Sequence, residues 1–269
     1  MNKPADLPKG WEARWYLWDG GFLTLGRSTT VVPPHAHHAI QILIVLDGTA
    51  GLAVPGGAPL DADGVIVMAD SPHELHTRDA RYGLVFVDPE TLEGRWLRRS
   101  YGEGISRIDD ARAADAVARL RHIDVAPGDG SAIARDIQAI VRALCSGPEP
   151  QRPIDERVSR ALTLIRGMDT SKISLEQIAA GVFLSPSRFA HLFSEHVGLP
   201  FRRYILWRRL TRAMMAVGRG RTLSAAAHEC GFADSAHLTR TCYQMLGQPP
   251  SVLLLAGEFW EIPAPFDIA

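Results

Sequence analysis

The sequence has no hydrophobic run long enough to cross a bilayer, which takes about 20 apolar residues; its longest apolar stretches, such as residues 40–46, are far shorter. Cysteine is scarce: Cys145, Cys230 and Cys242 are widely separated, odd in number and outside any C-x-x-C pair. We therefore expect neither a disulfide framework nor a structural zinc site. The first ten residues lack the apolar core of a secretory signal, so we expect a cytoplasmic protein without a membrane partner.

The chain also lacks a glycine-rich phosphate loop and the Ser-His-Asp or Cys-His arrangements of nucleophilic catalysis, so we do not expect an enzyme. A strong net charge is absent as well, at −1 overall, but the charge is unevenly distributed. Residues 1–150 hold 15 basic and 20 acidic residues, whereas residues 151–257 hold 14 basic and 7 acidic ones. The basic block suggests contact with a polyanion, although a solvated basic face would have the same composition.

With 269 residues the chain is long enough for two domains. Residues 15–90 alternate short β-branched runs with Gly and Pro turns, which predicts a small β-barrel or sandwich. Residues 109–147 show helical spacing, and three prolines in residues 146–153 indicate a linker. We expect these divisions: a first domain over 1–147, a linker over 148–154, a helical domain over 155–257 and a tail over 258–269.

The basic part contains an internal repeat. Residues 174–198 and 223–247 each predict a short helix, a turn and a second helix, followed by Gly-x-Pro. This is the plan of the helix-turn-helix, whose second helix fits the DNA major groove. Between the repeats, residues 201–217 predict a helix about 25 Å long, which can hold two such units roughly one DNA turn apart. A last short helix is expected around 250–255. The predicted fold class is α+β multidomain: a barrel with helices, then an all-α domain with two helix-turn-helix units joined by a long helix.

Residues 155–257 resemble the paired helix-turn-helix domain of AraC/XylS-type transcription regulators. The matching motifs are Leu184-Ser-Pro, Gly198-Leu-Pro-Phe, Gly231-Phe-Ala-Asp-Ser-Ala-His-Leu-Thr-Arg and Gly247-Gln-Pro-Pro. The resemblance implies sequence-specific binding to double-stranded promoter DNA. The chain departs from the pattern at Phe183, where many members have a turn glycine, and in the second unit, where Cys242 replaces phenylalanine. The departures in the second unit suggest that the first unit binds DNA more strongly.

The resemblance also identifies the residues expected to face DNA. Arg240 suits base recognition because its guanidinium can bond guanine O6 and N7, although a packing role is the alternative. The arginines of residues 201–217 are expected to contact phosphates, with a solvated face as the alternative. The expected DNA-contacting set is Ser185, Ser187, Arg188, Ala190, His191, Arg202, Arg203, Arg208, Arg209, Ser235, Ala236, His237, Thr239 and Arg240.

Histidines cluster in the predicted barrel. His35, His37 and Gln41, followed by Gly48, resemble the cupin motif H-x-H-x3-E-x6-G with glutamine in place of glutamate. His73, with His76 as the second choice, matches the later cupin strand. We expect these five residues to line the pocket of a small effector. A divalent metal bound by His35, His37, Gln41 and His73 is one alternative, and purely structural histidines are another.

The leading interpretation is a regulator whose DNA binding is controlled by an effector in the barrel. Two other classes remain: a metal-dependent cupin enzyme fused to a DNA-binding domain, and a protein-interaction module that binds no DNA. The helices of residues 109–147 suggest a homodimer, although their apolar stripe would equally pack on the barrel. RNA polymerase is a further expected partner. The sequence identifies neither the effector nor the operator, and it does not distinguish activation from repression.

Overall fold

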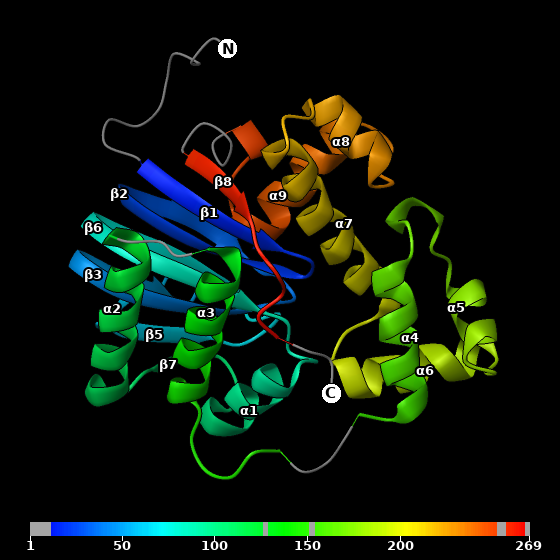
Figure 1. The fold of residues 1–269 in the computed structure, drawn as a ribbon, viewed down its shortest axis with the longest axis horizontal. Coiled ribbons are helices and arrows are strands. Elements are labelled where there is room, and N and C mark those ends of the chain that lie inside the picture. Colours follow the sequence, from blue (N-terminus) through cyan, green and yellow to red (C-terminus); the bar gives the residue numbers. More distant parts are fainter. Residues whose placement is uncertain (1–11, 126–128, 151–153, 252–256, 267–269) are drawn as a thin grey trace.

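The computed structural model describes residues 12–125, 129–150, 154–251 and 257–266. The N-terminal part is built on one large sheet, and helices cover both of its faces (Figure 1). Its strands are β1 (Glu12–Trp18), β2 (Gly21–His35), β3 (Ile40–Ala53), β4 (Leu60–Asp61), β5 (Gly64–Val67), β6 (His73–Val87), β7 (Ile105–Arg107) and β8 (Gly257–Glu261).

The sheet is open, whereas the sequence predicts a closed barrel. Its hydrogen-bonded order is β7-β5-β3-β6-β2-β1-β8, with β4 paired to β3, so β7 and β8 are the edges within the described residues. Helices shield part of each face, and a cluster of side chains from the sheet itself shields the rest, so the sheet does not need to close on itself. Strand β8 lies within the expected C-terminal tail and pairs in parallel with β1, from Ala13 opposite Gly257 to Leu17 opposite Glu261.

Strand β3 explains why the sequence shows an unbroken apolar run there. Ile40, Ile42 and Ile44 point to the face covered by the two long helices after the sheet, and they share a core with the stripe of the second helix. Leu43 and Val45 point to the opposite face and belong to another buried cluster. A strand buried on both sides needs no polar alternation.

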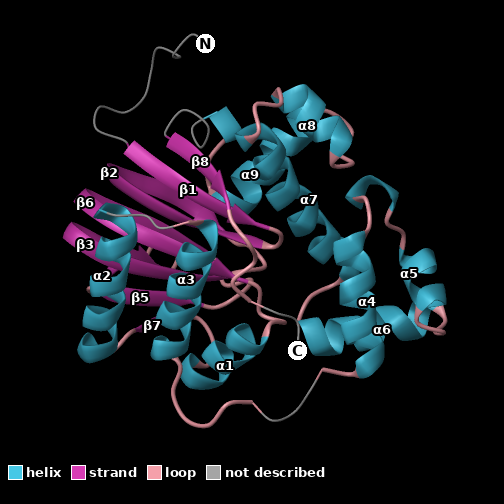
Figure 2. Ribbon diagram, viewed as in Figure 1, coloured by secondary structure: helices cyan, strands magenta, loops and turns pink. Residues whose placement is uncertain are grey.

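The helices fall into two groups (Figure 2). Three follow the sheet in sequence: α1 (Leu92–Tyr101), α2 (Asp110–Val125) and α3 (Gly130–Leu144). Helix α1, whose N-cap is Thr91, was not predicted from the sequence. The second group forms the C-terminal part: α4 (Glu156–Gly167), the 3-10 turn η1 (Thr170–Lys172), α5 (Leu175–Gly181), α6 (Pro186–Val197), α7 (Phe201–Gly218), α8 (Leu223–Glu229) and α9 (Ser235–Leu246).

The two helix-turn-helix units differ in where their cores lie. The first unit, with α4, α5, α6 and the start of α7, has a core of its own that includes Phe189, Phe193 and Tyr204. The second unit, with α8 and α9, shares one continuous core with the sheet, in which Leu238 and Leu246 join residues of β1 and β2. The second unit is therefore attached to the N-terminal domain, while the first stands more by itself.

Two expectations fall partly on residues that the structure does not describe. Residues 151–153 of the expected linker and residues 252–256 of the expected last helix lie outside the described ranges. Among the helices that are described, none is both long and apolar enough to span a membrane.

Candidate DNA-binding face and effector site

Helix α6 is the first candidate recognition helix, and its N-terminal end faces solvent. Ser185 caps it by accepting the backbone N–H of Arg188 at 3.3 Å. Ser187, Arg188 and His191 are exposed, and Ala190 is half-buried. The apolar side chains of this helix form the core beneath it, as the sequence predicts: Phe189, Leu192 and Phe193.

Helix α9 is the second candidate recognition helix. Asp234 caps it by accepting the backbone N–H of His237 at 2.6 Å. The hydroxyl of Thr239 donates to the carbonyl of Ser235 at 2.8 Å, so it is already bonded within the helix. Arg240 and Ala236 are exposed, whereas Ser235, His237 and Thr239 are half-buried. The exposed guanidinium of Arg240 is thus available to a base edge, which favours recognition over packing for this residue.

The arginines of α7 do not form one basic face. Arg202 and Arg203 are both exposed, but the guanidinium of Arg203 lies 2.6 Å from the carboxylate of Asp70 in the N-terminal domain. Arg209 is half-buried and donates to a backbone carbonyl of η1 at 3.1 Å. Of these three, Arg202 has the surroundings expected of a phosphate contact.

Arg208 corrects the sequence-based expectation. Its side chain is completely buried, 2.5 Å from the Asp19 carboxylate and 4.0 Å from that of Asp88. The adjacent Trp207 donates from Nε1 to the carbonyl of Gly20 and to Asp88, each at 3.1 Å. In this arrangement Arg208 joins α7 to the N-terminal domain and does not reach DNA. Helical spacing groups it with Arg209, but the local sequence cannot reveal two carboxylates from two distant segments.

Next to the contact between Arg208 and Asp88 lie two further buried ionisable groups, His38 and Glu90. His38 Nε2 lies 2.9 Å from a Glu90 carboxylate oxygen, and neither side chain is measurably exposed to solvent. Burial opposes charge on both, but their attraction prevails: it raises the pKa of His38 and lowers the pKa of Glu90. Burial, with Glu90 nearby, raises the pKa of Asp88 to about 7. The interface between the domains is therefore strongly polar beside its apolar core.

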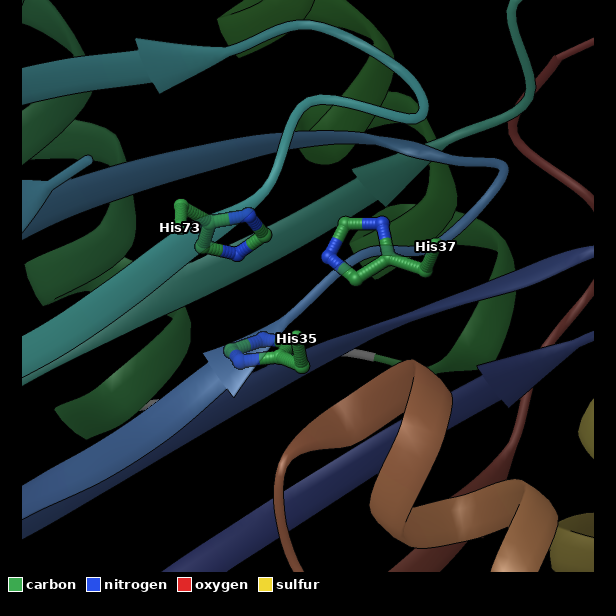
Figure 3. A group of neighbouring side chains, drawn as sticks. All are labelled: His35, His37 and His73. Carbon is green, nitrogen blue, oxygen red and sulfur yellow. The ribbon is translucent and has the colours of Figure 1, made fainter. Parts of the chain in front are cut away.

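Three of the predicted histidines, His35, His37 and His73, lie close together (Figure 3). Ligating nitrogens of His35, His37 and His73 all lie within 4.8 Å of one another. In each ring Nδ1 lies 2.8 to 2.9 Å from a backbone carbonyl two residues away. Because a carbonyl only accepts, Nδ1 carries the proton and Nε2 keeps its lone pair. Burial lowers the pKa of His35 and His37, and with His35 nearby it lowers that of His73 to about 3, so all three rings are neutral.

Gln41 joins the cluster. Its side-chain amide lies 3.0 Å from His37 Nε2 and 3.4 Å from His73 Nε2. Two arrangements satisfy these contacts. With its oxygen inward, Gln41 adds a fourth ligand to three imidazole nitrogens around a metal ion, a set that suits Zn, Fe, Ni or Mn. With its nitrogen inward, the amide donates one hydrogen to each imidazole, and the site is complete without a metal.

His76 does not belong to this cluster. Its Nε2 lies 3.0 Å from the carboxylate of Glu74, and its side chain is partly exposed. His73 and His76 are three residues apart on β6, so their side chains leave opposite faces of the sheet. Of the five residues predicted to line an effector pocket, the structure brings four together: His35, His37, Gln41 and His73.

A cavity of about 60 Å³ adjoins the histidine cluster on the face of the sheet that meets the C-terminal domain. His35 and Gln41 form part of its wall, and the sheet supplies most of the rest. The other side chains could not be identified from the sequence, because they come from three separated strands, β1, β2 and β6, and from the end of α9. Its full lining is Ala13, Trp15, Phe22, Thr24, Gly26, Val32, His35, Gln41, Leu75, Tyr82, Leu84, Phe86, Leu246 and Gln248.

The C-terminal end of α9 forms part of the wall of this cavity. Leu246 and Gln248 line it, and Gly247 between them ends the helix with a φ of 68°. A Cβ on Gly247 would stand 2.5 Å from Val32 and 2.9 Å from His35. Next to it, the backbone N–H of Ala36 donates to the carbonyl of Gln244 at 3.3 Å. The second recognition helix and the histidine cluster are thus in direct contact.

Comparison with known proteins agrees with this architecture. Residues 178–255 match the helix-turn-helix domain family. No curated protein sequence matches the chain. Among solved structures, ToxT from Vibrio cholerae O395 is 13% identical with a TM-score of 0.52, covering 93% of this chain and 99% of that one. An unsaturated-fatty-acid-bound ToxT from V. cholerae strain SCE256 is 12% identical with a TM-score of 0.51, covering 94% and 98%.

A shorter structure with an AraC-type DNA-binding domain, from Chromobacterium violaceum, is 22% identical over 37% of this chain and 92% of its own, with a TM-score of 0.35. The ToxT structures share the whole two-domain fold. The helix-turn-helix match covers the segment in which the sequence motifs and the two exposed recognition helices occur. The helix-turn-helix domain and the two-domain layout predicted from the sequence are therefore confirmed.

Proposed function

We infer that this chain, an AraC/XylS-type regulator by its helix-turn-helix domain and its fold, binds promoter DNA under the control of a small molecule held in its N-terminal domain. One observation carries the regulatory part of this proposal: the second recognition helix shares a core with the sheet and forms a wall of the sheet's cavity. A ligand in that cavity touches the DNA-binding domain directly. Solved ToxT with a bound fatty acid supports small-molecule control of this architecture.

The coupling between ligand and DNA follows from that shared wall. A ligand shifts a conformational equilibrium only by its difference in affinity for the two states. A molecule between His35 and Leu246 has different contacts when α9 rests on the sheet and when it moves away. Since α6 belongs to a separate core, the ligand would change the position of one recognition helix relative to the other. The spacing of the two units on DNA is therefore the quantity under control.

The DNA contacts remain a proposal, supported by exposure and by the residue types. We retain those on α6 and α9 and Arg202 from α7, while Arg203 and Arg209 would first have to leave their present partners. A homodimer is also retained. The Ile137 stripe of α3 packs on the sheet, so the dimer would use the polar outer faces of α2 and α3. Light scattering of the purified chain tests the dimer, and pull-down with RNA polymerase tests that partner.

Binding of the full chain to its own upstream intergenic DNA, by fluorescence anisotropy across a salt series, tests the regulator. We expect selective binding that weakens steeply with salt, because phosphate contacts release counterions. Arg240→Ala should lose about tenfold in affinity for that DNA but little for random DNA, since a bidentate base contact is lost. Arg99→Ala, which removes an exposed arginine of α1, is the matched control. No DNA affinity at low salt would reject the proposal.

A second candidate function is metal binding, alone or within an enzyme of the cupin type. The observation that favours it is the set of three Nε2 lone pairs that converge with the Gln41 amide. His35, His37, His73 and Gln41 would hold the ion, which would supply Lewis acidity when bound. Metal analysis of the purified chain, with His37→Ala beside His76→Ala, tests this candidate. Stoichiometric metal lost only in His37→Ala would support it, and metal-free protein with no uptake of added Zn²⁺ would reject it.

A further inference from the structure

The wall of the cavity beside the histidines carries no formal charge among its described residues. Aromatic and aliphatic side chains dominate it, from Trp15 and Phe22 to Leu84 and Phe86. An ion moved from water into such surroundings loses its hydration without gaining a partner of opposite charge. Carboxylates, phosphates and ammonium groups therefore bind poorly in this cavity.

Hydrogen-bond acceptors and donors both line the cavity. His35 donates from Nδ1 to the Pro33 carbonyl at 2.9 Å, which leaves Nε2 as an acceptor. The hydroxyl of Tyr82 is bonded to Ser28 at 3.0 Å. Trp15, another lining residue, has its Nε1 buried without a hydrogen-bond partner, so the cavity offers both an acceptor and a donor. A hydroxyl group on the ligand, which can donate and accept, suits both.

The volume limits the size of the ligand. A site for one water takes about 10–15 Å³ by this measure, so about 60 Å³ has room for roughly half a dozen non-hydrogen atoms. A single six-membered ring with one substituent matches that size.

From charge, hydrogen-bonding groups and volume together, we propose that the effector is a small uncharged ring compound with one hydroxyl group, of the phenol or cyclohexanol class. The hydroxyl donates to His35 Nε2, and the ring lies among the aromatic side chains of β1, β2 and β6. This inference rests on the proposed function, because it takes this cavity as the effector site.

Isothermal titration of the full chain with phenol, toluene and benzoate tests the ligand class. The three probes share one ring and differ in a donor group, no polar group and a carboxylate. We expect phenol to bind at least tenfold more tightly than either of the others. Benzoate binding as tightly as phenol would overturn the proposal, and so would equal affinity for toluene and phenol.

Variants locate the site. His35→Leu should reduce phenol affinity about tenfold and leave toluene affinity unchanged, whereas His76→Leu, the matched control outside the cavity, should change neither. Leu84→Trp fills the cavity and should abolish binding of all three probes. This variant tests the site even if His35→Leu does not fold. Unchanged phenol affinity in Leu84→Trp would place the ligand elsewhere and overturn the proposal.

Anisotropy of the DNA complex with and without phenol separates the two proposals. If phenol binds as expected but leaves DNA affinity unchanged, the ligand class holds and regulation through this cavity fails. If selective DNA binding is found but none of the probes binds, the regulator holds and the ligand class fails.

Discussion

Phe183 has a backbone conformation that usually belongs to glycine. Its φ is 58° in the turn between α5 and α6, and its side chain is 86% exposed. The left-handed region costs a residue with a Cβ about 1–2 kcal/mol, and an exposed ring recovers little of this. Phe183→Gly should therefore raise the free energy of unfolding by about 1 kcal/mol, after the added entropy of the unfolded chain is subtracted. Urea titration followed by circular dichroism measures it.

Glu195→Gly, at an exposed position inside α6, is the control. Glycine in a helix interior costs about 1 kcal/mol, so this variant should be less stable than the parent. A loss of stability in both variants would show that Phe183 is held by contacts that outweigh its strain.

Arg202 and Arg208 lie on the same helix and should behave in opposite ways. Arg208→Met leaves the buried Asp88 without this counter-charge, while Asp19 keeps its ion pair with Arg212, so we expect a loss of about 3 kcal/mol in unfolding free energy. Arg202→Met should change stability by less than about 0.5 kcal/mol. It should instead weaken DNA binding and reduce the salt slope by about one.

The pairing of Arg208 has its own test. Adding Asp88→Asn to Arg208→Met removes the carboxylate that is left buried, so the double variant should regain part of the lost stability in the same urea titration. If Asp88→Asn only adds to the loss, the two residues are not coupled.

Among the elements, β8 shows how a short terminal segment can complete a sheet. A Cβ on Gly257 would lie 1.9 Å from the carbonyl oxygen of Ala13, so only glycine fits where β8 meets β1. We expect Gly257→Ala to detach the strand and lower the free energy of unfolding by about 1–3 kcal/mol. Near-ultraviolet circular dichroism should change too, since Trp15 stacks on Phe259 with ring centroids 6.0 Å apart.

Gly167→Ala provides the comparison for β8. Gly167 ends α4, and a Cβ there would meet nothing within 4 Å. Its substitution should be neutral or slightly stabilising, because alanine favours the helix. If both glycine variants unfold alike, β8 does not depend on the close approach.

Element boundaries followed the sequence wherever local chemistry sets them. Ser174 and Ser185 cap α5 and α6 because their hydroxyls accept backbone N–H groups three residues ahead, a signal contained in the sequence itself. Strand β8 has no such signal, since its partner β1 lies at the other end of the chain. The choice between His73 and His76 likewise needed the register of β6, in which His73 stands opposite His35.

At the scale of the whole molecule, the two helix-turn-helix units should differ in independence. A fragment of residues 148–269 keeps the core of the first unit but exposes the side of the second that packs on the sheet. We expect hydrogen exchange to show protected amides in α4, α6 and the start of α7, with rapid exchange in α8 and α9. In the full chain both units should be protected. Equal protection of α9 in the fragment and the full chain would contradict this.

The sequence could predict those parts of the site that depend on neighbouring residues, but not those that depend on contacts between distant segments. The exposed faces of α6 and α9 follow from motifs, because the residues that show them are adjacent in sequence. The burial of Arg208, the open sheet and the cavity depend on contacts between segments more than a hundred residues apart. Helical periodicity assigns Arg208 to a basic face, and only the position of Asp19 and Asp88 beside it shows that this assignment is wrong.

Leu246 and Gln248 belong to the DNA-binding domain, yet they line the cavity of the sheet. A substitution at either position that adapts the cavity to a new molecule also alters how α9 rests on β2. Substitutions that change ligand preference at these positions therefore also change the response to promoter DNA. In directed evolution toward a new inducer, we expect epistasis between these two positions and the exposed residues of α9, so that improved variants arise as pairs of changes.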